Sequence, residues 1–198
     1  MSSYHHGNLR AALLESAIAV IGEKGVEGIS LREIAKDLGV SHAAPTRHFK
    51  NKSDLLAAIV RDAYQELTSV ILEEADRCEK DQAIERLNIM ARSTIRWAMD
   101  NRAKFSAMTN PDVSRFADDD LKAALGAFIS TLSAAIDIAK TKGFKHDVSM
   151  ETLLLYSVGA ALGAATLMTD DLMRSVLGPK VSEALIANIA NQIVPLED

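Results

Sequence analysis

The chain has 198 residues, enough for one large domain or two small ones, and its 48% hydrophobic and 25% charged fractions are ordinary for a globular protein. A single cysteine, Cys78, excludes an internal disulfide and suits a reducing compartment. The net charge of −5 argues, taken alone, against a nucleic-acid-binding protein. Residues 1–12 lack the apolar stretch of a secretory signal, so we expect a cytoplasmic protein.

The N-terminal residues predict two consecutive helices with clear ends. Apolar side chains recur at helical spacing over residues 8–24, and Gly25 ends this first helix. Ser30 is a good N-cap for the second helix, and Glu33 three residues later completes a capping box. Gly39 stops that helix, because glycine tolerates the left-handed conformation found at helix ends.

A third, short helix is predicted over residues 42–48, capped by Ser41 and followed by Phe49. It carries little apolar material, so most of it must face outward. A polar, capped helix held against an apolar one is typical of a helix-turn-helix, whose second helix lies in the DNA major groove. Pro45 removes a backbone donor there, and we expect it to disfavour a helical Ala44.

A long helix is predicted over residues 52–78, opened by an N-cap arrangement of Asn51 and Asp54. No proline or glycine interrupts it. We therefore place a domain boundary inside this helix and expect an N-terminal domain of residues 1–60 and a C-terminal domain of residues 61–198.

The remainder also reads as helices with short breaks and shows no strand-like alternation, which predicts an all-α fold. Helices are expected over residues 81–101 and 121–142, near residue 149 onward, and from Gly178 and Pro179 to the end. The helix over residues 121–142 has apolar residues on more than one face, so we expect it to be central. The acidic run at residues 118–120 is interpreted as its N-cap and not as a metal site.

Charge is distributed unevenly along the chain. Residues 1–60 hold seven Lys or Arg and six Asp or Glu, whereas the rest carries a net charge of −6. Within residues 30–52 the balance is five basic against two acidic side chains. A basic patch on an acidic protein makes a nucleic-acid partner credible.

Residues 8–60 resemble the N-terminal domain of the TetR/AcrR transcription regulators. The resemblance rests on a helix ended by glycine, a capped helix, a GVS turn, a short segment ending in HF and a lysine that opens a long helix. YHHGNL at residues 4–9 and SHAAP at residues 41–45 resemble one subgroup of that family. The resemblance implies a three-helix helix-turn-helix bundle, linked by a long helix to an all-helical ligand-binding and dimerisation domain whose last two long helices pair across a two-fold axis.

The outward face of the third helix and its surroundings supply the candidate DNA contacts. Arg47 is suited to a phosphate or a guanine edge, and the small Ala43 allows close approach. His48 and Lys52 match family positions that hold phosphates, whereas Thr46 stands where the family usually has tyrosine. The predicted DNA-binding residues are Arg32, Ser41, His42, Ala43, Thr46, Arg47, His48 and Lys52.

Residues 152–169 carry no charge, which meets the length of a membrane span, and include the small pair Gly159 and Gly163. Acidic flanks and many small side chains favour a buried helix of a soluble protein instead. We interpret its small face as a homodimer interface, with ordinary intrachain packing as the alternative. The predicted interface residues are Leu153, Ser157, Ala160, Ala161, Ala164, Leu185 and Ile189.

A set of large apolar side chains in the C-terminal part fits either a plain core or the wall of a ligand cavity. The spacing alone does not decide between the two, and the family resemblance favours a cavity for a small hydrophobic effector. The candidate ligand-binding residues are Tyr64, Met90, Arg96, Trp97, Phe105, Met108 and Phe128.

The function predicted is a ligand-responsive, homodimeric DNA-binding regulator, a repressor that binds a palindromic double-stranded operator and is released by its effector. No HExxH, GxSxG, P-loop or CxxC motif occurs, so we expect neither an enzyme nor a bound cofactor or metal. The alternative is a dimeric helical protein with a degenerate DNA-binding domain that acts through protein–protein contacts, an interpretation motivated by Pro45 and Thr46.

Overall fold

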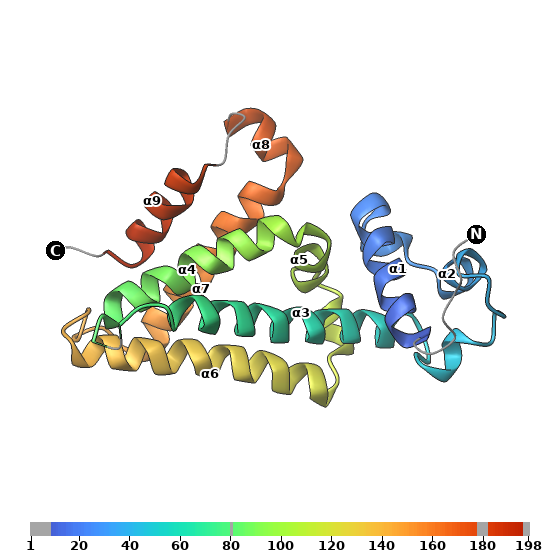
Figure 1. Ribbon diagram of the computed structural model, residues 1–198, viewed down its shortest axis with the longest axis horizontal. Helices are drawn as coiled ribbons and strands as arrows, with labels where there is room; N and C mark the ends of the chain where they lie inside the picture. Colours follow the sequence, from blue (N-terminus) through green and yellow to red (C-terminus); the bar gives the residue numbers. More distant parts are fainter. Residues whose placement is uncertain (1–8, 80, 178–181, 196–198) are drawn as a thin grey trace. The chain divides into compact units, whose positions relative to one another are not determined.

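The computed structural model describes residues 9–79, 81–177 and 182–195, and in these ranges the chain forms helices and turns but no strand (Figure 1). The predicted all-α fold class is confirmed. The α-helices are α1 (Leu9–Lys24), α2 (Leu31–Asp37), α3 (Lys52–Ala75), α4 (Ala83–Asp100), α5 (Arg102–Met108), α6 (Asp119–Thr141), α7 (Met150–Thr169), α8 (Asp171–Leu177) and α9 (Glu183–Ile193). Short 3₁₀ turns cover Val26–Gly28, Pro45–Arg47 and Val113–Phe116.

The chain divides into two compact units that are not continuous in sequence. The N-terminal unit contains the residues up to Ala63 together with Arg102–Ala124, and the C-terminal unit contains Tyr64–Asn101 and the residues from Leu125 onward. The predicted boundary at residue 60 is close to the point where the chain first passes from one unit to the other, between Ala63 and Tyr64. The return of Arg102–Ala124 to the N-terminal unit differs from the predicted pair of continuous domains, and it follows from the packing of α5 against α1.

Local capping signals define the helix ends of the N-terminal unit as predicted. The Ser30 side chain accepts a hydrogen bond from the backbone N–H of Glu33 at 3.4 Å. Gly25 and Gly39 have φ values of 73° and 69°, a region that side chains other than glycine rarely adopt. The inward face of α1 is then buried through Leu13, Leu14, Ala17 and Ile21.

Helix α4, and not α6, is the central element of the C-terminal unit, so the prediction for residues 121–142 is wrong on this point. α4 packs against both α7 and α9. It buries three polar residues, Asn88, Ser93 and Thr94, which weaken its apolar pattern in the sequence. α6 instead exposes part of its apolar surface, including Ile138 at 52%.

Two helices, Asp119–Thr141 and Met150–Thr169, are long and apolar enough to cross a membrane by length and composition alone. In each, 22% of the apolar window is buried inside the protein. The core helix of a soluble protein passes the same criterion, so this is weak support for a membrane span.

The C-terminal end differs from the prediction in one helix. Helix α8 is a separate helix after Thr169, where no break between helices is predicted. The predicted start of the last helix at Gly178 and Pro179 lies outside the described residues. Within them, Ser182 caps α9 and accepts a hydrogen bond from the N–H of Leu185 at 3.2 Å.

Candidate nucleic-acid interface and effector cavity

The segment after α2 does not form the α-helix predicted over residues 42–48. The chain makes successive turns and a single 3₁₀ turn at Pro45–Arg47, with the N–H of Ala44 donating to the Ser41 carbonyl at 2.9 Å. Proline has no N–H, so position 45 cannot donate the α-helical bond to Ser41. The expected bias of Ala44 away from helical angles is wrong, since its φ of −66° and ψ of −43° are helical.

Two buried side chains hold this segment in place. Pro45 and Phe49 are buried, and the Arg10 guanidinium of α1 lies 5.5 Å from the centroid of the Phe49 ring. The sequence analysis did not single out Arg10, because the contact is between elements. The candidate DNA-binding residues of this stretch are all exposed: Arg32, Ser41, His42, Ala43, Thr46, Arg47 and His48.

Thr46 is exposed, but its hydroxyl already has a local partner. Its Oγ1 donates to the Ala43 carbonyl at 2.8 Å. The bond leaves the methyl group and the oxygen lone pairs of Thr46 for an outside contact. Thr46 therefore acts as an apolar or acceptor surface and not as a free donor.

Lys52, at the start of α3, is held by the turn that precedes α2. Its Nζ donates to the Glu27 carbonyl at 3.2 Å and lies 3.5 Å from the Glu27 carboxylate. The predicted cap of this helix is present, since Asn51 Oδ1 accepts from the N–H of Asp54 at 2.9 Å. The Asp54 carboxylate in turn accepts from the N–H of Lys50 at 3.0 Å. Lys52 thus has a structural role beside its predicted phosphate contact.

The C-terminal unit encloses two adjoining apolar cavities. The inner cavity, of about 30 Å³, lies between α4, α6, α7 and the end of α9. The outer cavity, of about 160 Å³, lies between α3, α4 and α6. Met90 lines both of them, and we infer that its side chain forms the partition between the two volumes. Neither wall offers much polar surface, which favours an apolar occupant.

Of the predicted ligand-binding residues, Met90 and Phe128 line the inner cavity. Tyr64 packs its ring 5.7 Å from that of Phe128, and burial raises the pKa of its hydroxyl. Trp97 is buried, and its Nε1 donates to Glu66 at 3.2 Å. Their roles in ligand binding remain predictions.

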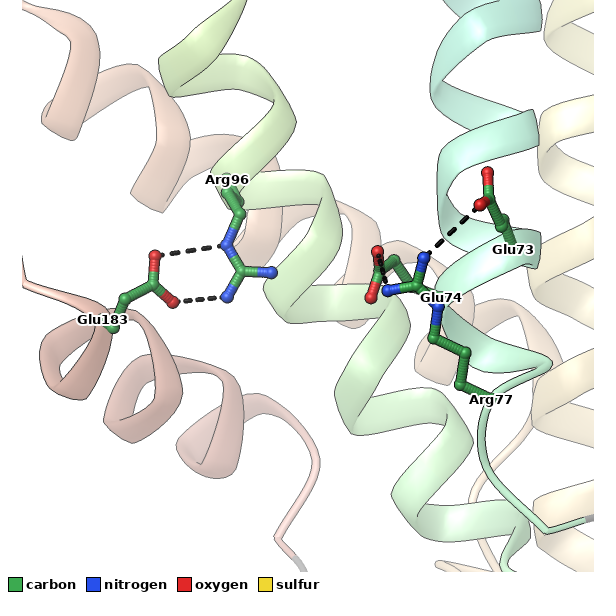
Figure 2. A network of polar contacts seen from close by, with 5 residues as sticks. All are labelled: Glu73, Glu74, Arg77, Arg96 and Glu183. Atoms are coloured by element: carbon green, nitrogen blue, oxygen red, sulfur yellow. Dashed lines mark hydrogen bonds and ion pairs between the residues drawn. The ribbon is translucent and has the colours of Figure 1, made fainter.

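The other predicted ligand-binding residues do not line these cavities. Phe105 and Met108 belong to the N-terminal unit. Arg96 lies on the outer side of α4, where its guanidinium forms an ion pair with Glu183 of α9, as Figure 2 shows. The hydrogen bond from Arg96 is the main cause that holds the pKa of Glu183 below the ordinary glutamate range.

The predicted interface residues are divided between the inside of the chain and its surface. Buried residues are Leu153 and Ala161, and Ser157 lines the inner cavity with Ala161. Ala160 is half-buried, Ala164 and Ile189 pack against a core cluster, and Leu185 is 41% exposed.

The surface of α7 carries a row of exposed residues, which extends the predicted small pair Gly159 and Gly163 to larger apolar neighbours. Leu155 is 77% exposed and Tyr156 and Leu167 about half exposed, with the exposed Gly159 and Gly163 in line between them. The four-residue spacing from 155 through 159 and 163 to 167 was the available signal.

Comparison with known proteins supports the interpretation of the N-terminal unit. Residues 13–59 match the sequence model of the bacterial regulatory proteins of the tetR family. An HTH-type transcriptional regulator of Mycobacterium tuberculosis is 27% identical over 134 residues, which are 65% of this chain and 57% of the relative. The chain thus matches little more than half the length of that curated relative.

Solved structures resemble the whole chain. A protein of unknown function from Rhodococcus sp. RHA1 has 25% sequence identity and a TM-score of 0.79 over 98% of this chain and 97% of its own. AibR, solved in complex with isovaleryl coenzyme A and operator DNA, has 21% identity and a TM-score of 0.73 over 93% of this chain and 97% of its own. At that identity the likeness shows the fold alone. Residues 13–59, which cover the N-terminal helices and the turn that follows them, thus match the tetR family of bacterial regulatory proteins.

Proposed function

We propose that this protein is a ligand-responsive transcriptional regulator that binds double-stranded operator DNA as a homodimer and represses transcription. The observation that carries the proposal is the exposed segment of residues 41–48, fastened by the buried Pro45 and Phe49 within the stretch that matches the tetR family. A rigidly held, polar, exposed segment beside an apolar helix is what groove binding requires.

Arg47 is the best residue with which to test the DNA surface, because it is exposed and lies in no ion pair among the described residues. Lys52 is a poorer choice, since replacing it also removes its bonds to Glu27. We expect Arg47→Ala to weaken operator binding about tenfold and to reduce the salt dependence by about one phosphate contact. Arg115→Ala, in the same unit, is the matched control and should bind normally.

The operator itself is found by selection from random-sequence DNA at defined salt, because affinities without a salt concentration cannot be compared. A two-fold dimer should enrich a palindrome, with half-sites spaced by the distance between its two recognition segments. Enrichment of single half-sites would contradict the proposed dimeric binding.

The homodimer is assigned to the exposed row on α7 together with Leu185 of α9. A contiguous apolar surface of this kind is costly to leave in water. We expect Leu155→Lys to give monomers in sedimentation, because two buried lysines would face each other across a two-fold axis. Leu125→Lys, at an exposed apolar position of α6, is the control that should leave the dimer intact.

The effector is proposed to be a small apolar molecule, or one with an apolar group, bound at the outer cavity. A cavity of about 150 Å³ lined by aliphatic side chains accommodates benzene, so a group of that size fits the 160 Å³ found here. AibR, with the same fold, binds isovaleryl coenzyme A, whose acyl group is small and branched. A short acyl thioester is therefore the first candidate.

The effector signal is proposed to pass through the chain segments common to both units. α3 and α6 each contribute residues to both units, and α4 continues into α5 between Asn101 and Arg102. An effector that favours one arrangement of these helices changes DNA affinity only as far as it binds the two conformations differently. Operator binding measured with and without effector gives that coupling directly.

The alternative remains a dimeric protein that acts through protein–protein contacts. It is favoured by the absence of a regular recognition helix over residues 42–48 and by Thr46, whose hydroxyl is tied to Ala43. Failure to enrich any DNA sequence, from a protein that sediments as an intact dimer, would support this alternative.

A further inference from the structure

A third cavity, with a quite different lining, lies on the outer face of α4. This polar groove has a volume of about 510 Å³ and is formed by the end of α3, by Arg77, Cys78 and Gln82, and by α4. Arg77, Arg92 and Arg96 contribute guanidinium groups to its wall, and Glu74 and Glu85 contribute carboxylates. Positions 85, 92 and 96 share one side of α4, whereas Met90 faces the apolar cavities. The groove is therefore separate from the proposed effector cavity.

Each arginine of the polar groove is paired with a glutamate, and two of these glutamates line the groove themselves. Arg77 Nη1 lies 2.7 Å from Glu74 and Arg92 Nη2 lies 3.0 Å from Glu85. Arg96 pairs with Glu183 of α9, and Figure 2 shows this pair together with the contacts of Arg77. These pairs are partly exposed to solvent, where ion pairs are weak and exchange partners readily.

Ser93 supplies an unsatisfied polar group to the same groove. It is 2% exposed and lines the groove, yet its hydroxyl has no hydrogen-bond partner among the described residues. The neighbouring Thr94, also buried, donates its hydroxyl to the Met90 carbonyl at 2.9 Å, the usual arrangement in a helix. Buried polar groups are nearly always hydrogen-bonded, so an unpartnered hydroxyl in a polar cavity indicates a missing partner.

We propose that the polar groove binds a small zwitterion of the α-amino acid class. On binding, an arginine guanidinium leaves its glutamate partner and pairs with the carboxylate of the ligand. The ammonium group of the ligand then pairs with the glutamate that the arginine has left. One ion pair is broken and two are formed, and the ligand supplies a hydrogen-bond partner for the Ser93 hydroxyl.

The balanced wall disfavours other classes of ligand. A polyanion would lie against the carboxylates of Glu74 and Glu85, and a cation would lie against the three guanidinium groups. An apolar molecule would remove the charged groups from water without replacing their partners. A ligand that carries one positive and one negative group can pair with both the guanidinium groups and the carboxylates of the wall.

The proposal is tested by isothermal titration of the full-length protein with each of the twenty common L-amino acids. We expect at least one to bind with a Kd in the millimolar range or tighter. Its N-acetyl derivative and its amide, each lacking one charge, should bind about tenfold more weakly. Arg92→Gln should weaken binding by a similar factor, and Ser93→Ala should weaken it less.

Arg115→Gln is the matched control, because Arg115 is an exposed arginine paired with Asp112 at 2.9 Å outside the polar groove. It should bind like the unmodified protein. The proposal is overturned if none of the twenty amino acids gives a binding heat, if the two derivatives bind as well as the parent, or if Arg92→Gln leaves the Kd unchanged. Circular dichroism confirms that each variant is folded, and no DNA is involved in the measurement.

Discussion

Met90→Ala is expected to destabilise the protein and to join the two apolar cavities. Met90 is 3% exposed and is the side chain that lines both the 30 Å³ and the 160 Å³ cavity. Truncation of a buried methionine to alanine costs about 2–5 kcal/mol, the larger values where the neighbours cannot relax. Because Met90 already borders empty space on two sides, its packing is incomplete and we expect about 2–3 kcal/mol.

Calorimetric melting measures this effect. For a chain of 150–250 residues, 1 kcal/mol shifts Tm by about 2–4 °C, so a loss of about 2–3 kcal/mol should lower Tm by about 4–12 °C. Met90→Leu conserves volume and should cost less than about 1.5 kcal/mol, which makes it the matched control. The joined cavity should also accept a benzene-sized probe, which should raise the Tm of Met90→Ala more than that of the unmodified protein.

A Tm of Met90→Ala within about 2 °C of the unmodified protein would refute the reasoning. Met90 would then not be a packed partition, and the two cavities would not be separate volumes. If the probe raised the Tm of both proteins equally, the expectation that the two cavities join in Met90→Ala would be refuted, because truncation of Met90 would have opened no space.

Three further outcomes are expected. Asn88→Ala should cost about 1–3 kcal/mol in denaturant unfolding, since buried Asn88 donates to the Val194 carbonyl at 2.9 Å and its loss leaves that oxygen unpaired. Glu183, whose pKa is lowered chiefly by the hydrogen bond from Arg96, contributes stability above the ordinary glutamate pKa of about 4.3 that is lost as pH falls through the lowered value. The Tm difference between Glu183→Gln and the unmodified protein should therefore shrink as the pH is lowered below about 4.3, and a constant difference would contradict the assignment. Ser30→Ala should cost about 1 kcal/mol through its lost cap, and Ser30→Asp should not.

The helices of the N-terminal unit were predictable because their signals are local. Ser30, Gly39 and the Asn51 and Asp54 pair lie within a few residues of the backbone groups they satisfy. A cap satisfies nearby backbone N–H groups independently of the tertiary packing. The predicted helices over residues 8–24, 52–78, 81–101 and 121–142 accordingly occur with ends within three residues of those expected.

The segment of residues 41–48 differs from its prediction, and the residue that causes the difference is Pro45. Pro45 lacks the N–H that an α-helix over residues 42–48 needs at this position, so the predicted helix is wrong. The structure resolves the conflict by making 3₁₀ bonds, which need no donor at position 45, and by keeping Ala44 helical. The tertiary anchor at Phe49 then fixes the segment without a regular helix.

The cavities and the surface of α7 depended on packing between distant elements, which spacing alone does not specify. Met90 and Phe128 line the inner cavity, whereas Arg96 lies outside it and pairs with Glu183, 87 residues further along. On α7, small residues occur on both the inward and the outward side, so composition did not identify which side was free.

The discontinuity of the N-terminal unit affects how this protein is made. On the ribosome, α1 emerges early, but the α5 segment that covers it is not complete until about residue 124 has been added. At a synthesis rate of about 5–20 residues per second, several seconds pass before α5 can pack against the early helices. A released fragment that stops near residue 63 would lack the segment that covers α1. An exchange of the N-terminal unit with that of a relative would require transplanting two segments, because residues 102–124 must be moved as well.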